Sequence, residues 1–212
     1  MPSTYSQPVF RYQRSPDQGV GRTAHHVAVV VGAGPVGLAA ALDLARHGIR
    51  CVVLDDDDTV SVGSRAVCYA KRALEVLDRL ECGEPVVERG VSWKLGKVYF
   101  HDRLVYSFDL LPEEGHRRPA FVNLQQYHFE EILLDRARRD AAIDLRWKNK
   151  VVGVTPGDDR VSIDVETPDG PYSLTCDWLI VCDGARSPVR HMLGLESKGQ
   201  VFRDHFLIAD VI

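Results

Sequence analysis

HVAVVVGAGPVGLAAALDLARHGIRCVVLD, residues 26–55, is the stretch that decides the fold. Residues 27–31 form a short apolar run, which is typical of a strand buried on both faces. Leu38, Leu42 and Ala45 then recur at helical spacing, and a second apolar run follows over residues 51–54. The sequence therefore predicts a strand, a tight glycine turn, a helix and a second strand, the unit from which parallel α/β sheets are built.

The turn between the first strand and the helix, Gly32-Ala33-Gly34-Pro35-Val36-Gly37, fits the pattern G-x-G-x-x-G. Gly32 permits the tight turn, Gly34 lets a pyrophosphate approach the backbone, and Gly37 lets the helix lie close to the strand. Pro35 suits the first helical turn, where its missing N–H costs nothing. Asp55 follows the second strand, about 20 residues after the glycines, where a carboxylate accepts hydrogen bonds from ribose hydroxyls. This context predicts a dinucleotide site.

Two questions stay open on the motif alone. FAD and NAD both carry an adenosine ribose and a pyrophosphate, so the glycines do not separate them. Residues 55–58 are four consecutive aspartates, so Asp55 could also belong to a solvated acidic turn.

Composition limits the class of protein. The chain has 212 residues, 45% hydrophobic and 26% charged, as in ordinary globular proteins. Its net charge of −4 argues against a nucleic-acid or membrane surface as partner. Five cysteines without C-x-x-C or metal spacing predict reduced thiols in a cytoplasmic protein, and we expect no metal site.

The flanking segments are assigned from composition and periodicity. Residues 1–24 are polar and lack a signal-peptide core, so we expect a flexible or surface-hugging arm. Apolar residues recur at helical spacing over residues 64–80 and again over residues 125–139. Glu130, in the second of these helices, is expected to be solvated or paired. A strand is expected over residues 143–147.

The block of residues 85–118 interrupts this alternation of helices and strands. Residues 93–100 and 103–108 alternate in the manner of a hairpin around His101 and Asp102. We therefore expect the block to be an insertion outside the nucleotide-binding fold.

The C-terminal third begins with three short strands joined by Pro/Gly/Asp turns, which predict an antiparallel meander over residues 151–154, 161–165 and 172–176. The apolar run 178–182 is expected to be a separate central parallel strand. Asp183 and Gly184 stand at its carboxyl end, where ligands of open α/β sheets bind. Ser187 is expected to cap a short helix that begins at Pro188 and runs to about residue 193. A last strand is expected over residues 206–212.

With these elements placed, the chain resembles the class A flavoprotein monooxygenases, the para-hydroxybenzoate hydroxylase-like aromatic hydroxylases. It is most similar to the branch of 3-(3-hydroxyphenyl)propionate hydroxylase-like and phenol hydroxylase-like enzymes. The resemblance rests on GAGPVGLAAALDLARHGIRCVVLD, SRAVCYAKRALEVLDRL with LQQYHFEEIL, and DWLIVCDGARSPVRHMLGL. It implies a Rossmann-like FAD-binding α/β fold with a parallel sheet, a three-stranded antiparallel meander crossover and the start of an inserted β-rich substrate domain.

The resemblance also implies roles for single residues. Gly32, Gly34 and Gly37 would hold the FAD pyrophosphate, with Pro35 and Val36 at the helix start and Val36 donating its N–H. Asp55 would bind the adenosine ribose. Arg65 would reach the phosphates, unless it is a solvent-facing arginine at a helix start. Gln126 would contact the ribityl chain, with Gln125 as the competing choice. Asp183 and Gly184 would contact the ribityl–pyrophosphate region, and Arg186 would have a structural or pyridine-nucleotide role.

The implied activity is hydroxylation of a small phenolic or aromatic substrate with NADH or NADPH and O₂. No catalytic residue is named within the chain. The expected domains are an arm (1–24), an incomplete FAD-binding domain (25–84 and 119–196) and the beginnings of a substrate domain (85–118 and 197–212). The chain is expected to be the N-terminal part of a longer hydroxylase. The competing interpretations are another FAD-dependent oxidoreductase, of reductase or halogenase type, and a non-catalytic fragment.

Overall fold

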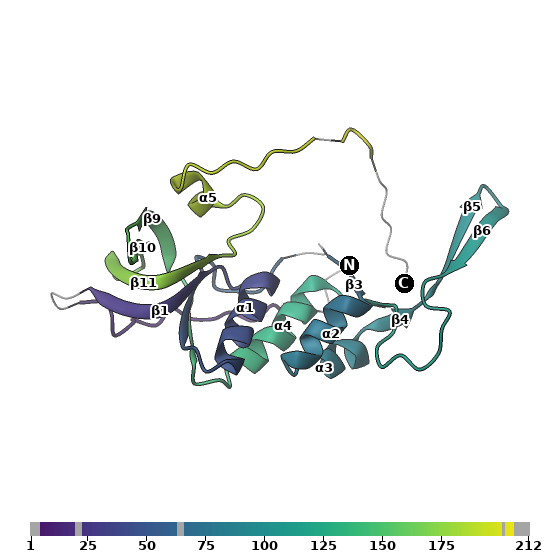
Figure 1. Ribbon diagram of the computed structural model, residues 1–212, viewed down its shortest axis with the longest axis horizontal. Coiled ribbons are helices and arrows are strands. Elements are labelled where there is room, and N and C mark those ends of the chain that lie inside the picture. The colour runs from purple at the N-terminus through teal and green to yellow at the C-terminus, as the bar shows by residue number, and fades with distance from the viewer. Residues whose placement is uncertain (1–4, 20–22, 63–65, 201, 206–212) are drawn as a thin grey trace.

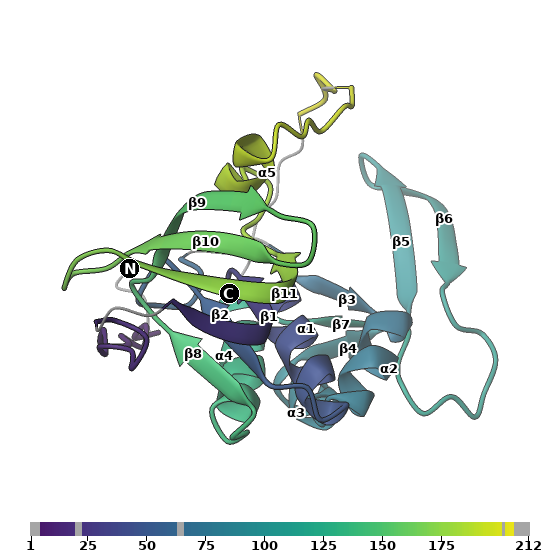
Figure 2. The same cartoon turned by 60° about the vertical axis from the view of Figure 1, so that its left-hand side comes forward.

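The computed structural model describes residues 5–19, 23–62, 66–200 and 202–205. A six-stranded sheet lies at its centre, in the order β8-β2-β1-β11-β10-β9 (Figures 1 and 2). The first four of these strands run parallel, and β11, β10 and β9 form an antiparallel meander. The strand bounds are β1 Ala24–Val31, β2 Cys51–Leu54, β8 Ile143–Arg146, β9 Lys150–Pro156, β10 Val161–Glu166 and β11 Tyr172–Val181. The predicted Rossmann-like fold with its meander is confirmed.

Strand β1 is buried on both faces of the sheet, as its apolar run predicts. Ala28 and Val30 belong to a core shared with the helices. Val29 and Val31 belong to a second core, on the opposite face, with β9, β10 and β11. Because successive side chains of a strand point to opposite faces, a continuous apolar run supplies both cores.

The helical face of the sheet is covered by α1 (Pro35–Arg46) and α4 (Gln126–Ala137), which pack against each other (Figure 1). Leu38 and Leu42 of α1 are buried, and so are Phe129 and Leu133 of α4. Helix α1 ends at Arg46, just before Gly48, which adopts a φ of 75° that glycine tolerates without strain.

The helix predicted over residues 64–80 is wrong in its first part. Residues 68–70 form strand β3 (Cys68–Ala70), and of the described residues in this range only those of α2 (Lys71–Arg79) are helical. The cause is a partner distant in sequence: β3 pairs with β7 (Phe121–Asn123), which also pairs with β4 (Val91–Trp93). Backbone pairing in this three-stranded sheet overrides the local helical periodicity.

Helix α3 (Gly83–Arg89) follows directly and was not expected from the sequence. Arg118 holds the two helices together from the far end of the inserted block. Its guanidinium is 5% exposed, forms a bidentate pair with Asp78 of α2, and donates to Glu84 of α3 at 2.9 Å. These pairs raise the pKa of Arg118 above its usual value, although burial opposes the rise.

The predicted hairpin is confirmed as β5 (Leu95–Phe100) and β6 (Arg103–Asp109). It stands away from the rest of the molecule (Figure 2). Tyr99, Phe100 and Val105 are each more than half exposed. The hairpin therefore lies outside the central sheet, whereas α3 and β4 of the same block pack against the helices and β7.

The meander's last strand differs from expectation. Residues 172–176 and 178–182 were predicted as two strands, whereas β11 is one continuous strand from Tyr172 to Val181. Its first half pairs with both β10 and β1, so the backbone continues without a turn at Asp177. Helix α5 (Pro188–Met192) is capped as predicted, with Ser187 Oγ accepting the Arg190 N–H at 2.9 Å. The strand predicted over residues 206–212 lies outside the described residues.

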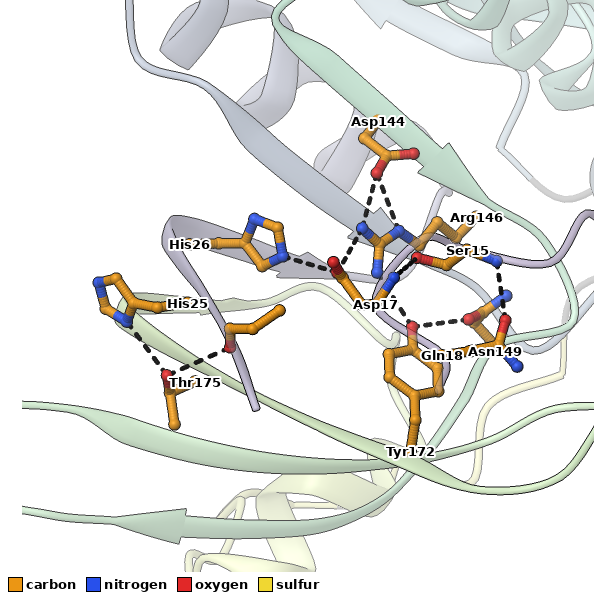
Figure 3. A network of polar contacts seen from close by, with 11 residues as sticks. Ser15, Asp17, Gln18, His25, His26, Asp144, Arg146, Asn149, Tyr172 and Thr175 are labelled. Carbon is orange, nitrogen blue, oxygen red and sulfur yellow. Dashed lines mark hydrogen bonds and ion pairs between the residues drawn. The ribbon is translucent and has the colours of Figure 1, made fainter. Parts of the chain in front are cut away.

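Residues 5–19 of the predicted arm follow the surface of the domain in a defined path, and we call them the N-terminal strap. Asp17 points toward His26 of β1 and Arg146 of β8, at 2.8 Å and 2.7 Å (Figure 3). Of the two predicted alternatives, the surface-hugging arm is the correct one. Within the described ranges, no helix is both long and apolar enough to cross a membrane.

Candidate functional site

A cleft of about 510 Å³ opens at the carboxyl ends of β1, β2 and β11. This edge is where the strand order of an open α/β sheet leaves room for a ligand. The sequence-predicted residues that line the cleft are Gly32, Gly34, Pro35, Val36, Asp55, Gln126, Asp183, Gly184 and Arg186. The tertiary structure therefore gathers side chains from four segments that are distant in sequence.

The three motif glycines have different steric surroundings. A Cβ on Gly32, whose φ is 101°, would lie 2.5 Å from the Cys182 carbonyl oxygen. A Cβ on Gly37 would lie 1.8 Å from the Gly32 carbonyl oxygen. A Cβ on Gly34 would meet nothing within 4 Å and would project into open space. Gly32 and Gly37 are thus required by the protein's own packing, whereas Gly34 leaves room for something that is not part of the chain.

The start of α1 faces the cleft. Gly34 is the N-cap residue and Pro35 the first helical residue, so no side chain caps the first turn. The N-terminus of a helix carries unpaired N–H groups and a partial positive charge, which together favour a phosphate. The side chain of Val36 is 69% exposed at the rim of the cleft, and Gly37 lies beneath it, buried.

Asp55 is tied to the glycine turn. Its Oδ2 accepts the Ala33 N–H at 2.5 Å, and its Oδ1 accepts the Asp57 N–H at 2.8 Å. Burial raises the pKa of Asp55, and the two backbone donors oppose that rise. The carboxylate is therefore a fixed acceptor at the end of β2, and it is not part of a freely solvated acidic turn.

Gln126 and Glu130 form a buried polar pair on α4. Gln126 donates from Nε2 to Glu130 Oε1 at 2.7 Å, and its Oε1 accepts the Ala66 N–H at 3.2 Å. Glu130 Oε2 accepts the Ser61 N–H at 2.6 Å. Gln125 is exposed and does not line the cleft. Of the two glutamines, Gln126 is therefore the one that the structure places at the cleft.

Of the two alternatives expected for Glu130, solvated or paired, the solvated one is wrong: the residue is only 3% exposed, lines the cleft and is paired with Gln126 and the Ser61 N–H. The spacing from Gln126 to Glu130 is i, i+4, which places both side chains on one face of a helix. That signal was available in the sequence.

Asp183 and Gly184 follow β11 at the other side of the cleft. Asp183 Oδ2 accepts the Val189 N–H at the start of α5, at 3.0 Å. Gly184 has a φ of 87°, a conformation that side chains disfavour, and a Cβ there would meet open space. Arg186 is exposed at the cleft rim. The neighbouring Arg190 donates to the Ala185 carbonyl, so it braces this turn.

Arg65, also predicted for the site, lies outside the described residues. The structure adds cleft residues that no motif indicated, among them Thr59, Ser61, Asn149 and Lys150. The Ser61 hydroxyl is buried without a hydrogen-bond partner in the part of the chain that the structure describes. A buried orphan hydroxyl beside an open cleft fits a site that a polar ligand completes.

Comparison with known proteins identifies the family. Residues 25–212 match the family described as the FAD binding domain. This chain belongs to that family. A flavin-dependent monooxygenase from Mycobacteroides abscessus is 35% identical over 192 residues, covering 86% of this chain and 40% of that protein. A 3-(3-hydroxy-phenyl)propionate/3-hydroxycinnamic acid hydroxylase from Mycolicibacterium smegmatis is 25% identical over 183 residues, covering 86% and 33%.

Among solved structures, the p-nitrophenol 4-monooxygenase of Pseudomonas putida DLL-E4 aligns with a TM-score of 0.80 and 32% identity, covering 85% of this chain and 46% of that one. The resemblance to class A aromatic hydroxylases is therefore confirmed for an FAD-binding domain. The chain spans less than half the length of these relatives.

Proposed function

We propose that the cleft binds FAD and that the chain is the FAD-binding part of a monooxygenase that hydroxylates a phenolic or aromatic substrate with NADH or NADPH and O₂. The observation that carries the proposal is the contrast among the three glycines. Two of them are closed off by the protein's own backbone, whereas Gly34 opens onto the cleft at the start of α1. A pyrophosphate fits the space that a side chain at this position would occupy.

The adenosine half of FAD would lie at the β1–β2 side of the cleft. The free N–H groups at the start of α1, that of Val36 included, would donate to the pyrophosphate. Asp55 would accept hydrogen bonds from the ribose hydroxyls, because its oxygens retain lone pairs beyond the two backbone N–H groups that they already bind.

The ribityl half would lie between α4 and the turn after β11. Gln126 keeps one Nε2 hydrogen that is not used by Glu130, and it would donate this hydrogen to a ribityl or phosphate oxygen. Asp183 and Gly184 would contact the same region from the opposite side. Arg186, and Arg65 from outside the described residues, would supply positive charge toward the phosphates or the pyridine nucleotide.

Bound FAD would supply the redox chemistry, namely acceptance of a hydride from NAD(P)H and activation of O₂. The residues of this chain bind and orient it. We assign residues 25–84 and 119–196 to the FAD-binding domain and residues 85–118 and 197–212 to the beginnings of a substrate domain. The exposed apolar side chains of the β5–β6 hairpin, Tyr99 and Phe100 among them, support this assignment. Five free cysteines favour a reducing compartment, the cytoplasm.

The test is a titration of the purified 212-residue chain with FAD, followed by flavin fluorescence, with NAD titrated in parallel. We expect saturable binding of FAD and at least about tenfold weaker binding of NAD, a difference of about 1.4 kcal/mol. Tighter binding of NAD would overturn the choice of cofactor and, with it, the proposed monooxygenase. A folded chain that binds neither nucleotide would overturn the assignment of the cleft as a self-sufficient site.

A further inference from the structure

The N-terminal strap, residues 5–19, precedes the segment that matches the family, which begins at residue 25. It nevertheless lies directly against a wall of the cleft. Residues 55–62, which we call the acidic wall, follow β2, and six of the eight line the cleft. The strap itself contributes no lining residue.

The strap and the acidic wall run antiparallel to each other. Gln7 Nε2 donates to the Ser61 carbonyl at 3.0 Å, and Thr59 Oγ1 donates to the Pro8 carbonyl at 2.6 Å. The Phe10 N–H donates to the Asp58 carbonyl at 2.7 Å. These three contacts, at 7/61, 8/59 and 10/58, tie the strap to the wall through two side chain–backbone hydrogen bonds and one backbone–backbone hydrogen bond.

Aromatic contacts anchor this part of the strap to the domain. The Phe10 ring stacks on Trp147, just after β8, with centroids 4.6 Å apart, and the Arg138 guanidinium lies 5.6 Å from the Phe10 centroid. The Tyr5 ring stacks on Tyr127 of α4 at 4.1 Å. Contacts of this kind add to the burial of apolar area, so the strap is fixed independently of its hydrogen bonds to the wall.

A second anchor holds the other end of the strap. Asp17 binds Arg146 and His26 (Figure 3). Gln18 Nε2 donates to Thr167 Oγ1 at 2.8 Å. None of these five residues lines the cleft. The strap therefore contacts the wall through residues 7–10 and is attached to the sheet separately, through residues 17–18.

The acidic wall needs external support for electrostatic reasons. Four consecutive carboxylates, from Asp55 to Asp58, repel one another, and among the described residues only Asp58 has an ion-pair partner within 4 Å, Lys148 Nζ at 3.1 Å. On the cleft side, Glu130 holds the Ser61 N–H. Without the strap the wall would lose three contacts, at Asp58, Thr59 and Ser61, and would be less restrained, although Glu130 would still hold the Ser61 N–H and Lys148 would still pair with Asp58.

We propose that the N-terminal strap is a positioning element of the flavin site: through Gln7, Pro8 and Phe10 it holds the acidic wall against which the FAD adenosine ribose docks. The proposal rests on the proposed function of the cleft. The strap touches no FAD atom itself, and its effect is to pre-organise the loop that carries the ribose acceptor Asp55.

The test compares variants at the two ends of the strap in the 212-residue chain. Gln7→Met removes the donor to Ser61 while keeping the length of the side chain, and Phe10→Ala removes the stack on Trp147. Tyr12→Phe is the matched control, because its hydroxyl contacts Gln18, Thr167 and Asp169 but not the wall. Phe10→Tyr, which retains an aromatic ring, is the rescue variant. Each variant is examined by FAD titration, thermal unfolding, and amide hydrogen exchange of residues 58–62 without FAD.

We expect Gln7→Met and Phe10→Ala to raise the FAD dissociation constant about five- to tenfold and to speed exchange of the wall amides, with Tyr12→Phe and Phe10→Tyr close to the parent chain. Equal FAD affinity and equal wall exchange in all variants would overturn the proposal. If FAD affinity instead falls in proportion to thermal stability in every variant, Tyr12→Phe included, the strap only stabilises the fold in general and the proposal is overturned. A parent chain that binds no FAD overturns the proposed function instead, and the exchange data still decide whether the strap holds the wall.

Discussion

Gln126 donates its Nε2 hydrogen to Oε1 of Glu130 over 2.7 Å, inside the cleft that lies beside the glycine turn. Because the Gln126 carbonyl oxygen already accepts the Ala66 N–H, the amide has a single orientation. Its remaining hydrogen is the group it can offer to a ligand. Glu130 also holds the Ser61 N–H, so one buried carboxylate orders both a cleft-lining side chain and the adjacent loop.

Glu130→Gln should disturb this arrangement without changing volume. The new amide can accept from only one of the two donors, and an unsatisfied buried donor costs about 1–3 kcal/mol. We expect a loss of about 1–2 kcal/mol in unfolding free energy and about tenfold weaker binding of FAD in fluorescence titrations. Asp135→Asn, at an exposed position of the same helix, is the control. Unchanged FAD affinity in Glu130→Gln would contradict the assigned role of the pair.

Gly34→Ala and Gly37→Ala should separate ligand binding from folding. A Cβ at Gly34 meets open space, so unfolding free energy should change by less than about 1 kcal/mol. The same methyl group would occupy the space of the pyrophosphate, and FAD should bind at least about tenfold more weakly.

Gly37→Ala places a Cβ against the Gly32 carbonyl and should lower stability by about 3 kcal/mol. Denaturant unfolding and FAD titration of both variants test the pair of predictions. If Gly34→Ala is stable and binds FAD as tightly as the parent chain, the pyrophosphate does not bind next to Gly34.

The binding of FAD should depend on the ionisation of Asp55. Burial raises the pKa of this carboxyl above its ordinary value of about 3.9. Since the carboxylate form accepts the ribose hydroxyls, FAD affinity should fall as the pH falls through that raised pKa.

The effect on folding has the opposite sign. The folded chain binds more protons at Asp55 than the unfolded chain does, so this group's contribution to stability falls as the pH rises from the unfolded pKa through the folded one. FAD titrations between about pH 4 and pH 7 with Asp55→Asn as control test the first statement. If FAD affinity depends on pH in the same way in Asp55→Asn, the titrating group is not Asp55.

Asp17 anchors the N-terminal strap by charge. Burial opposes its ionisation, but the hydrogen bonds and positive charge of His26 and Arg146 hold the pKa of Asp17 below its usual value. A depressed folded-state pKa gives stability that is complete above the unfolded pKa, about 3.9, and is lost as the pH falls through the folded pKa.

Asp17→Asn should therefore lower unfolding free energy by about 2 kcal/mol at neutral pH, because Arg146 keeps Asp144 but loses one buried partner. The difference from the parent should shrink in acid. Asp177→Asn is the matched control, since its pair with His25 is more exposed and should contribute less than about 1 kcal/mol. If Asp17→Asn lowers the unfolding free energy by the same amount in acid as at neutral pH, the stabilisation by Asp17 is not ionic.

Much of the fold follows from local patterns in the sequence. The apolar run 27–31, the glycine turn and the helix to Arg46 form as predicted, and so do the hairpin after residue 95 and the Ser187 cap. These elements depend on side-chain periodicity, on the conformational freedom of glycine and on short-range hydrogen bonds. Each of those is a property of a few neighbouring residues.

Elements that depend on distant partners were predicted less well. Residues 68–70 have a helical pattern, but β7, some 50 residues further along the chain, recruits them as a strand. The continuity of β11 through Asp177 follows from its parallel partner β1. Backbone pairing across the fold outweighs local preference at these positions, and no short window of sequence contains both partners.

Local sequence patterns identify the residues that could meet a dinucleotide: the three glycines and Asp55 are recognisable from their spacing around two strands. Only the tertiary structure decided that Gln126 lines the cleft and Gln125 does not, that Glu130 is buried beside it, and that the N-terminal strap supports the acidic wall. The physical reason is that burial and hydrogen bonding depend on neighbours in space. Those neighbours come from segments more than 50 residues apart, which the sheet and helix α4 bring together.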